Sequence, residues 1–391
     1  MSNVIVSFSR TPIGSFLGSF NTVSAPRLGS IAISGALKKI NLDFELIDRV
    51  IMGNVLSAGV GQAPARQASI YAGLPEKVDC LTINKMCGSG LQSIMLADQI
   101  INSNPNEIIV AGGMENMSMA PHYLLKSRQG TKMGEGKLVD GMVTDGLWDV
   151  YNNKHMGNCA EMCAEKYNIT REEQDDYAIL SYKRSQESIS NGKFSNEIVP
   201  VEISTRKSDI TIDQDEEPSR VSFDKLKALK PVFQKDGTVT AGNASTINDG
   251  ASVCVVMSSQ KASELNLEPI AKISHHCSSS HSPEWFTTAP IHSTSKLLDK
   301  AKININDVDL FEINEAFSVV TLAAIGQLNL DINKVNIYGG AVSMGHPIGA
   351  SGARIMCTLL NALKSEDKTH GIASICIGGG EASSMLVERL S

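Results

Sequence analysis

Several features that mark specialised classes of protein are missing from this chain of 391 residues. No uninterrupted apolar run reaches the roughly 18 residues that a membrane-spanning helix requires. Basic residues are not in excess, because 35 Lys and Arg face 42 Asp and Glu and leave a net charge of -7. A field of that sign does not attract nucleic acid or an anionic membrane. We therefore expect neither partner.

Cysteine is also scarce and irregularly spaced. The eight cysteines stand at positions 80, 87, 159, 163, 254, 277, 357 and 376. This spacing does not suit a disulfide framework or a zinc site, so we expect free thiols and no metal. The N-terminus enters a strand-like stretch without the apolar core of a signal peptide or a transit-peptide leader, which predicts a cytoplasmic protein.

The chain has the composition of an ordinary globular protein, and strand-like and helical patterns alternate along it. With 42% hydrophobic and 20% charged residues it can bury a large core. Apolar runs typical of strands alternate with helical patterns. The strand-like runs are 50–55, 107–111, 252–257, 335–338 and 372–377, and the helical patterns include 91–101 and 353–363. The pattern predicts an α/β fold, and the length predicts two domains.

A weak internal repeat indicates that the two parts are similar halves. VAGGMENMSM at 110–119 matches CIGGGEASSM at 376–385, and a small-residue turn opens a helix upstream of each, at 88–90 and at 350–352. We interpret this as duplication of one α/β unit rather than coincidence. Residues 119–239 are richer in charge and turns, which predicts an inserted loop region. Its segment 218–235 has five basic residues and one acid, either a solvated face or a site for an anionic ligand.

Cys87 lies in INKMCGSGLQSIMLA, where a strand-like stretch turns into a helix. The small neighbours allow a sharp turn that leaves the thiol at the helix N-terminus, where the helix dipole lowers the thiol pKa and favours a thiolate. That arrangement resembles the strand-to-helix turn that carries the nucleophile of serine hydrolases. The alternative is a small buried cysteine at a tight turn.

His346 lies in the glycine-rich loop of YGGAVSMGHPIGASGARI. A histidine there can activate a thiol and polarise an acyl oxygen, although a structural histidine in a turn is the alternative. The loop lacks the Lys-Ser/Thr ending of a P-loop and the spacing of a dinucleotide fingerprint, so we discount nucleotide binding of those kinds.

Two further residues are candidates for chemistry. Cys376 ends a strand before three glycines whose N–H groups can surround an oxyanion, and its thiol could move a proton opposite Cys87; a core cysteine is the alternative. Asn314, in FEINEAFSVV, could hold a water or an acyl oxygen, although a helix-capping role is the default explanation.

The segments NKMCGSGLQ, NEAFS, GGAVSMGHPIGASGARI and CIGGGEASSM occur in the order found in the thiolase family. The chain resembles this family over essentially its whole length, in particular the acetyl-CoA acetyltransferase (acetoacetyl-CoA thiolase) branch. The resemblance implies a five-layered αβαβα fold of two similar halves, with a long loop region inserted in the first. We expect an N-terminal domain at 1–268 and a C-terminal domain at 269–391.

The resemblance also implies roles for individual residues. Cys87 falls at the nucleophile that accepts the acyl group, Cys376 at the general acid/base, and His346 at the group that activates the nucleophile. His346 and a water held by Asn314 form one oxyanion hole, and the backbone N–H groups of Cys87 and Gly378 form the other. The reaction implied is the reversible condensation of two acetyl-CoA molecules to acetoacetyl-CoA and CoA.

Coenzyme A contacts are implied less directly, on the inserted region and on AGNAS at 241–245. The residues expected at CoA are Leu147, His155, Met156, Arg220, Ala241 and Ser245, and those expected at the acyl pocket are Phe286, Ala316 and Phe317. Phe286 matches the mitochondrial short-chain enzymes that accept a 2-methyl branch. Potassium binding stays open, because Pro218 and Ser219 stand where those enzymes carry Tyr and Lys. No tightly bound cofactor is expected.

Other classes of protein explain the residues less well. A ketosynthase relative commonly uses two histidines, a non-catalytic carrier does not need all four catalytic groups, and a cysteine protease does not explain the repeat or the paired cysteines. The alternative within the family is a 3-ketoacyl-CoA thiolase of broader chain length, active in fatty-acid β-oxidation. The family habit predicts a homo-oligomer, a dimer or a homotetramer, with a role in lipid metabolism.

Overall fold

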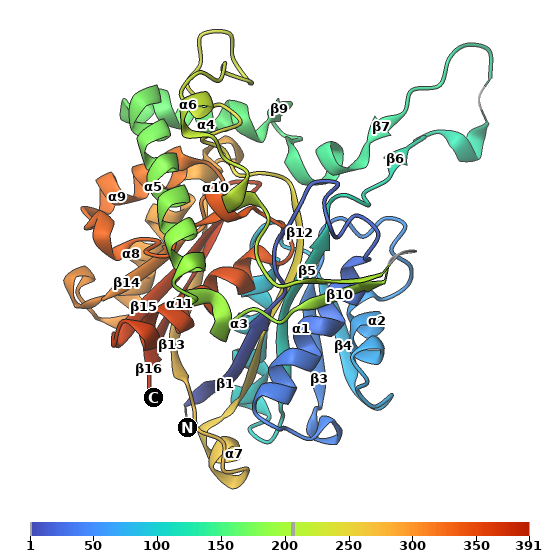
Figure 1. Cartoon of the computed structure of the whole chain (residues 1–391), viewed down its shortest axis with the longest axis vertical. Coiled ribbons are helices and arrows are strands. Elements are labelled where there is room, and N and C mark those ends of the chain that lie inside the picture. Colours follow the sequence, from blue (N-terminus) through green and yellow to red (C-terminus); the bar gives the residue numbers. More distant parts are fainter. Residues whose placement is uncertain (1, 131, 205–207, 391) are drawn as a thin grey trace.

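The computed structural model describes residues 2–130, 132–204 and 208–390. Its main strands, labelled in Figure 1, run in the order β14-β15-β16-β13-β1-β12-β5-β3-β4. The short β2 pairs with β12. The bounds of these strands are Asn3–Arg10 (β1), Gly14–Ser15 (β2), Arg49–Gly53 (β3), Asp79–Ile83 (β4), Ile109–Asn116 (β5), Asn248–Ser258 (β12), Ala271–Ser280 (β13), Leu310–Ile313 (β14), His370–Ile377 (β15) and Glu381–Arg389 (β16).

The helices occupy the connections between the strands. They are Ala25–Lys39 (α1), Pro64–Tyr71 (α2), Ser89–Ser103 (α3), Met156–Tyr167 (α4), Arg171–Ser190 (α5), Phe223–Leu226 (α6), Ser259–Glu264 (α7), Ala289–Ala301 (α8), Ser318–Leu328 (α9), Ala341–Met344 (α10) and Ser351–Ser365 (α11). None of these helices is both long enough and apolar enough to cross a membrane.

The strand order contains the same motif twice. In the first half β4, β3 and β5 are parallel, and β12 and β1 continue the sheet antiparallel. In the second half β14 and β15 are parallel, and β16 and β13 follow antiparallel. The outermost place is taken by Val335, which bridges Phe311 in parallel. The expected duplication is therefore confirmed, whereas the strand expected at 335–338 is reduced to this single bridge.

The ten-residue match that suggested the duplication does not superpose in the structure. Gly112 and Gly113 lie inside β5, whereas Gly378, Gly379 and Gly380 follow the end of β15. The short glycine match is thus misleading in its register. The order of strands and helices carries the repeat instead.

Apolar contacts arrange these elements in five layers. Ala32 of α1 and Ala68 of α2 share a core with one face of the first-half strands β1, β3, β5 and β12. The opposite face joins α3 and α11 in a central core with β15 of the second half. Leu297 of α8 and Ala324 of α9 cover the other face of the second-half strands, where they share a core with β14, β15 and β16. This is the αβαβα order that the resemblance to the thiolase family implies.

The central helices begin very close to each other. A Cβ atom on Gly90 would lie 2.6 Å from the backbone nitrogen of Ala353, and one on Gly352 would lie 2.3 Å from that of Leu91. Only glycine allows this approach. The small-residue turns at 88–90 and 350–352 therefore bring the N-termini of α3 and α11 together, and with them the segments carrying Cys87 and His346.

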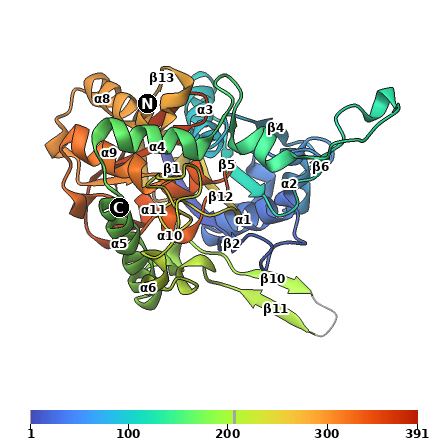
Figure 2. The same cartoon turned by 90° about the horizontal axis from the view of Figure 1, so that it is seen from above.

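The inserted region between β5 and β12 is more than a loop. It contains α4, α5 and α6, with the hairpins His122–Tyr123 (β6) with Val139–Asp140 (β7), Trp148–Asp149 (β8) with Lys154–His155 (β9), and Val201–Ser204 (β10) with Asp209–Ile212 (β11). The β6–β7 arm and the β10–β11 hairpin project from the body (Figure 2). Arg10 of β1, fully buried, binds Glu197 and Asp215 at 2.6 Å each and anchors the insert to the sheet.

Candidate active site

Cys87 lies in a tight turn directly before α3. The residue before it, Met86, has a left-handed φ of 47°. The hydroxyl of Ser89 accepts the N–H of Lys85 at 2.8 Å and donates to the carbonyl of Met86 at 2.6 Å. Gly88 leaves room for Ile377, because a Cβ there would lie 2.4 Å from the Ile377 Cδ1 atom. The turn is thus held rigidly from both sides, as the small residues predict.

The protonation state of Cys87 differs from the sequence-based expectation. Burial against the cavity wall raises the pKa of the Cys87 thiol to about 11, and the backbone N–H groups of Gly378 and Cys87 offset this only in part. The direction is opposite to the expected lowering at the helix N-terminus, because desolvation by burial is the largest contribution. The resting group is a thiol, and it needs a base to become a nucleophile.

Three buried side chains hold the loop that carries His346. The N–H of Val342 donates to Glu315 at 3.0 Å, that of His346 to Asn248 at 2.9 Å, and that of Gly349 to Glu115 at 2.9 Å. These acceptors come from the NEAFS segment, from β12 and from β5. The loop is therefore fixed at its start, its middle and its end.

The imidazole of His346 is oriented by Ser351. The Ser351 Oγ atom donates to the carbonyl of Pro347 at 2.9 Å and lies 2.6 Å from Nδ1 of His346. Because the hydroxyl has one proton, it accepts from Nδ1, and Nε2 carries a lone pair instead of a proton. Burial and the charge of Arg354 lower the pKa of His346 to about 3, so the ring is neutral. It can accept a proton at Nε2.

Asn314 and Cys376, the other two catalytic candidates, are both fully buried. The Asn314 Nδ2 atom is 3.5 Å from Nε2 of His346, and its Oδ1 atom is buried without a hydrogen-bond partner among the described residues. The helix-capping explanation for Asn314 is wrong, because Phe317 is the N-cap of α9. Burial, and next the charge of Cys87, raises the pKa of Cys376 well above its usual value.

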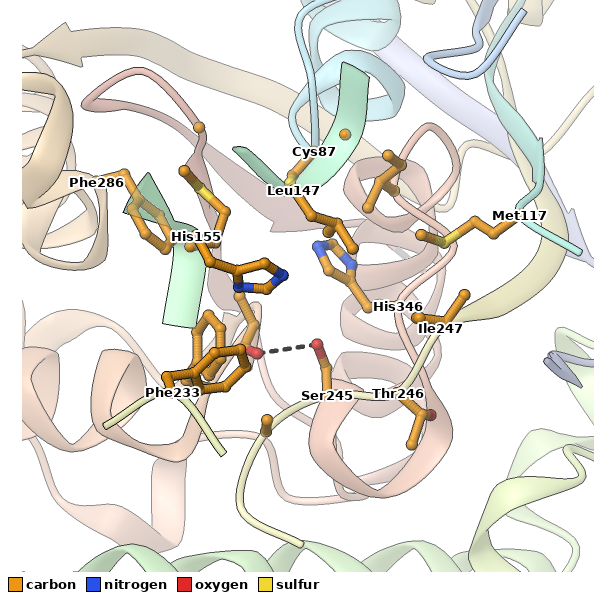
Figure 3. Close-up of a pocket in the computed structure, with 17 residues that line it drawn as sticks. Cys87, Met117, Leu147, His155, Phe233, Ser245, Thr246, Ile247, Phe286 and His346 are labelled. Carbon is orange, nitrogen blue, oxygen red and sulfur yellow. Dashed lines mark hydrogen bonds between the residues drawn. The ribbon is translucent and has the colours of Figure 1, made fainter. Parts of the chain in front are cut away.

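A cavity of about 240 Å³ opens onto Cys87 and His346 (Figure 3). Its expected members are Cys87, Leu147, His155, Met156, Ser245, Phe286, Ala316, Phe317, His346 and Gly378. Asn314 and Cys376 do not line it; both are fully buried, and Cys376 packs in one cluster with Ala316, Phe317 and Met156. The structure therefore brings the four catalytic candidates together, two at the cavity surface and two beneath it.

Arg220 and Ala241 line an adjoining hollow rather than the cavity itself. The two spaces share Phe233, Ala244, Ser245, Thr246 and Ile247. The Arg220 side chain is 59% exposed, and its nearest acid, Glu217, is 4.0 Å away. Lys227 of the same basic segment pairs with Asp176 instead. A long ligand could therefore run from Cys87 past Ser245 to the exposed guanidinium of Arg220.

Other residues at the site escaped the sequence analysis. Phe233 stacks on His155 with ring centroids 4.7 Å apart, and the wall also includes Met117, Gly146, Thr246, Ile247 and Ile348. Phe233 gave no signal beyond its place in the basic segment. Glu115 and Ser351 stood inside motifs that were recognised, but their hydrogen bonds depend on which loops meet. Across 2–130, 132–204 and 208–390, no three His, Cys, Asp or Glu side chains are grouped to hold a metal ion.

Comparison with protein families and known structures agrees with this geometry. Residues 3–260 match the thiolase N-terminal domain and residues 267–389 the thiolase C-terminal domain. "Acetyl-CoA acetyltransferase 1" of Arabidopsis thaliana is 51% identical, with 99% of this chain and 94% of the relative covered. "Acetyl-CoA acetyltransferase, mitochondrial" of Bos taurus is also 51% identical, covering 99% of this chain and 91% of that protein.

Solved structures give the same result. The acetyl-CoA acetyltransferase of Bacillus anthracis superposes with a TM-score of 0.97 at 39% identity, covering 100% of this chain and 99% of that one. A thiolase from Ascaris suum, in complex with coenzyme A, superposes with a TM-score of 0.94 at 43% identity over 100% of both chains. With both domains matched and full-length relatives at this identity, the chain belongs to the thiolase family.

Proposed function

We propose that the protein is an acetyl-CoA C-acetyltransferase, which condenses two acetyl-CoA molecules to acetoacetyl-CoA and CoA and catalyses thiolysis in reverse. The observation that carries the proposal is that Cys87 and His346 line one cavity while Asn314 and Cys376 are buried close to them. Full-length relatives with that name support it.

In the first half-reaction Cys87 takes the acetyl group from acetyl-CoA. His346 Nε2 removes the thiol proton as the sulfur attacks, and Ser351 holds Nδ1 so that the lone pair stays on Nε2. The proton gained by Nε2 turns His346 into a hydrogen-bond donor toward the departing thiolate or an acyl oxygen. Cys376, as the general acid, protonates the departing CoA thiolate, so CoA leaves as the thiol and Cys376 becomes a thiolate. His346 keeps its proton on Nε2, and the acetyl group stays on Cys87 as a thioester.

The second half-reaction needs a carbanion from a second acetyl-CoA. Cys376 removes a proton from the methyl group next to the thioester carbonyl, and the enolate oxygen is stabilised at His346 and at a water bound to Asn314. The orphaned Oδ1 of Asn314 supports this role, since it is free to accept a hydrogen bond. The carbanion then attacks acetyl-Cys87, and the N–H groups of Cys87 and Gly378 receive the tetrahedral oxyanion. Collapse of this intermediate breaks the C–S bond to Cys87, whose sulfur takes the proton back from His346 as acetoacetyl-CoA leaves.

Coenzyme A fits the path from Cys87 to Arg220. We assign the pantetheine arm to the wall formed by Leu147, His155, Met156 and Ser245, and the phosphate-bearing end to the hollow with Arg220 and Ala241. The relative that was solved with coenzyme A supports this class of ligand. We assign Phe286, Ala316 and Phe317 to the wall around the acyl group.

Bulky residues close to Cys87 favour a short acyl chain. Met117, Ile348 and Leu147 pack with Cys87 in one apolar cluster, so bulky side chains stand next to the nucleophile. The experiment is CoA-dependent cleavage of acetoacetyl-CoA and of a long-chain 3-ketoacyl-CoA by the same purified protein. We expect strong preference for acetoacetyl-CoA. Comparable rates would favour the broad-range thiolase, and cleavage of neither would refute the proposal.

Four broader aspects belong to the same proposal. We assign the protein to the cytoplasm and to lipid metabolism, we divide the chain at 1–268 and 269–391, and we expect a homo-oligomer, either a dimer or a homotetramer. Sedimentation of the purified protein tests the oligomeric state, and imaging of the tagged chain in its own cells tests the compartment, since the Bos taurus relative is named as mitochondrial. Parallel assays in potassium and sodium buffers test whether potassium has a role.

A further inference from the structure

A charged contact joins the two turns that carry the backbone N–H groups of Cys87 and Gly378. Lys85, two residues before Cys87, pairs through Nζ with Oε2 of Glu381, three residues after Gly378. The side chains are 27% and 34% exposed, so the pair is partly shielded from water. The wall of the cavity, as far as the structure describes it, includes neither residue. An effect on chemistry must therefore pass through the backbone.

The first turn transmits the position of Lys85 to Cys87. The N–H of Lys85 donates to Ser89 Oγ at 2.8 Å, and the carbonyl of Lys85 accepts the N–H of Gly88 at 3.1 Å. Between them Met86 has a left-handed φ of 47°, a conformation that costs energy for a residue with a side chain. A turn held in this way moves as one unit, so displacing Lys85 displaces Cys87.

The second turn links the position of Glu381 to that of Gly378. Ile377 at the end of β15 pairs directly with Glu381 at the start of β16, so only three glycines separate the two strands. Gly379 and Gly380 have positive φ angles of 95° and 83°, which glycine adopts without strain. The carbonyl of Gly380 accepts the N–H of His281 at 2.9 Å. Glu381 is thus fixed relative to Gly378.

The two turns also touch, and this contact limits how closely they can approach. Gly88 lies so near Ile377 that a Cβ on it would be 2.4 Å from Cδ1. We propose that the Lys85–Glu381 ion pair is a positioning contact. It draws the two turns together until Gly88 meets Ile377, and so sets the spacing of the Cys87 and Gly378 amides around the acyl oxygen. The inference rests on the proposed function, since it assigns these amides to the acyl group.

The test uses two single variants, Lys85→Met and Glu381→Gln, and the charge-swapped double variant Lys85→Glu with Glu381→Lys. We expect kcat for thiolysis of acetoacetyl-CoA to fall roughly tenfold in each single variant, less than the hundredfold or more expected when a whole oxyanion donor is lost. KM should change less than about twofold, and the swapped variant should recover most of kcat. Circular dichroism checks that each variant folds.

A matched control lies on the same strand. Lys272 of β13 pairs with Glu388 of β16 at 3.2 Å, with side chains 40% and 35% exposed, far along β16 from the glycine turn. Lys272→Met and Glu388→Gln remove a similar, somewhat more exposed ion pair without moving the turns. Their kcat should equal that of the unsubstituted protein.

A spectroscopic readout separates positioning from a general loss of stability. With ¹³C-labelled acetyl on Cys87, two well-placed amides polarise the carbonyl and lower its stretching frequency, so the band should shift to higher frequency in the single variants and stay in place in the controls. An unchanged kcat in both single variants, or a lower kcat with an unshifted band, overturns the positioning role. An unsubstituted protein that does not cleave acetoacetyl-CoA overturns the proposed function instead.

Discussion

Oε2 of Glu115 accepts the backbone N–H of Gly349 across 2.9 Å, so a carboxylate of the first half holds the loop that carries His346 in the second half. The same carboxylate accepts the N–H groups of Val55 and Leu56 and the side-chain amide of Asn54. It is fully buried, and burial raises its pKa to about 7. The two halves are therefore coupled through a group that titrates near neutral pH.

This coupling predicts a pH dependence of stability. Because the folded-state pKa lies above the usual value of 4.5, the folded protein holds this proton more tightly than the unfolded chain. The contribution to stability is complete below about pH 4.5 and is lost as the pH rises through 7. Relative to Glu115→Gln, which cannot titrate, the unfolding free energy of the unsubstituted protein should fall between pH 5 and pH 8. Denaturant titrations measure this, and a constant or rising difference contradicts it.

Ser351→Ala removes the acceptor that fixes the Nδ1 proton of His346. The ring can then take the other tautomer, in which Nε2 carries the proton and cannot act as a base. We expect kcat to fall by roughly ten- to a hundredfold, within the range of general base catalysis, with little change in KM. Ser365→Ala, at the exposed end of the same helix, is the control and should leave kcat unchanged. Equal activity of the two variants would remove Ser351 from the account.

The raised pKa of Cys87 predicts how the thiol reacts without substrate. Alkylation needs the thiolate, so the rate of inactivation by iodoacetamide should keep rising with pH beyond pH 9. His346, with its lowered pKa, holds little positive charge that could stabilise a resting thiolate. A rate that levels off near pH 7 would show a resting thiolate and contradict this description.

Arg220→Ala should weaken the binding of CoA and spare the chemistry, because Arg220 lines the outer hollow and not the cavity with Cys87. We expect KM for CoA in thiolysis to rise about fivefold, as for loss of one exposed charge contact, with kcat nearly unchanged. Lys235→Ala, exposed on the same basic segment, serves as the control. An unchanged KM in the Arg220 variant would exclude Arg220 from the ligand path.

The alternation of strands and helices is predicted well from the sequence because it depends on local signals, whereas the five-layered order follows from the resemblance to the thiolase family. Apolar periodicity marks β12 and α11, and Cys87 and His346 stand in small-residue turns that have few conformations. The prediction fails where the outcome depends on solvation or on distant contacts. The pKa of Cys87 follows from burial that no motif records, and the role of Glu115 depends on Gly349, 234 residues away. The strand predicted at 335–338 is only a single bridge at Val335, because strand pairing depends on a neighbouring segment that this stretch of sequence does not record.

The most direct test of the central claim is the site and extent of acetylation after acetyl-CoA is mixed with the protein, read by mass spectrometry of digested peptides. The account predicts one acetyl group on Cys87, none in Cys87→Ala, and full acetylation in Cys376→Ser, which should nevertheless fail to form acetoacetyl-CoA. Acetylation of a different residue, or equal loss of acetylation in both variants, would contradict the division of roles between Cys87 and Cys376.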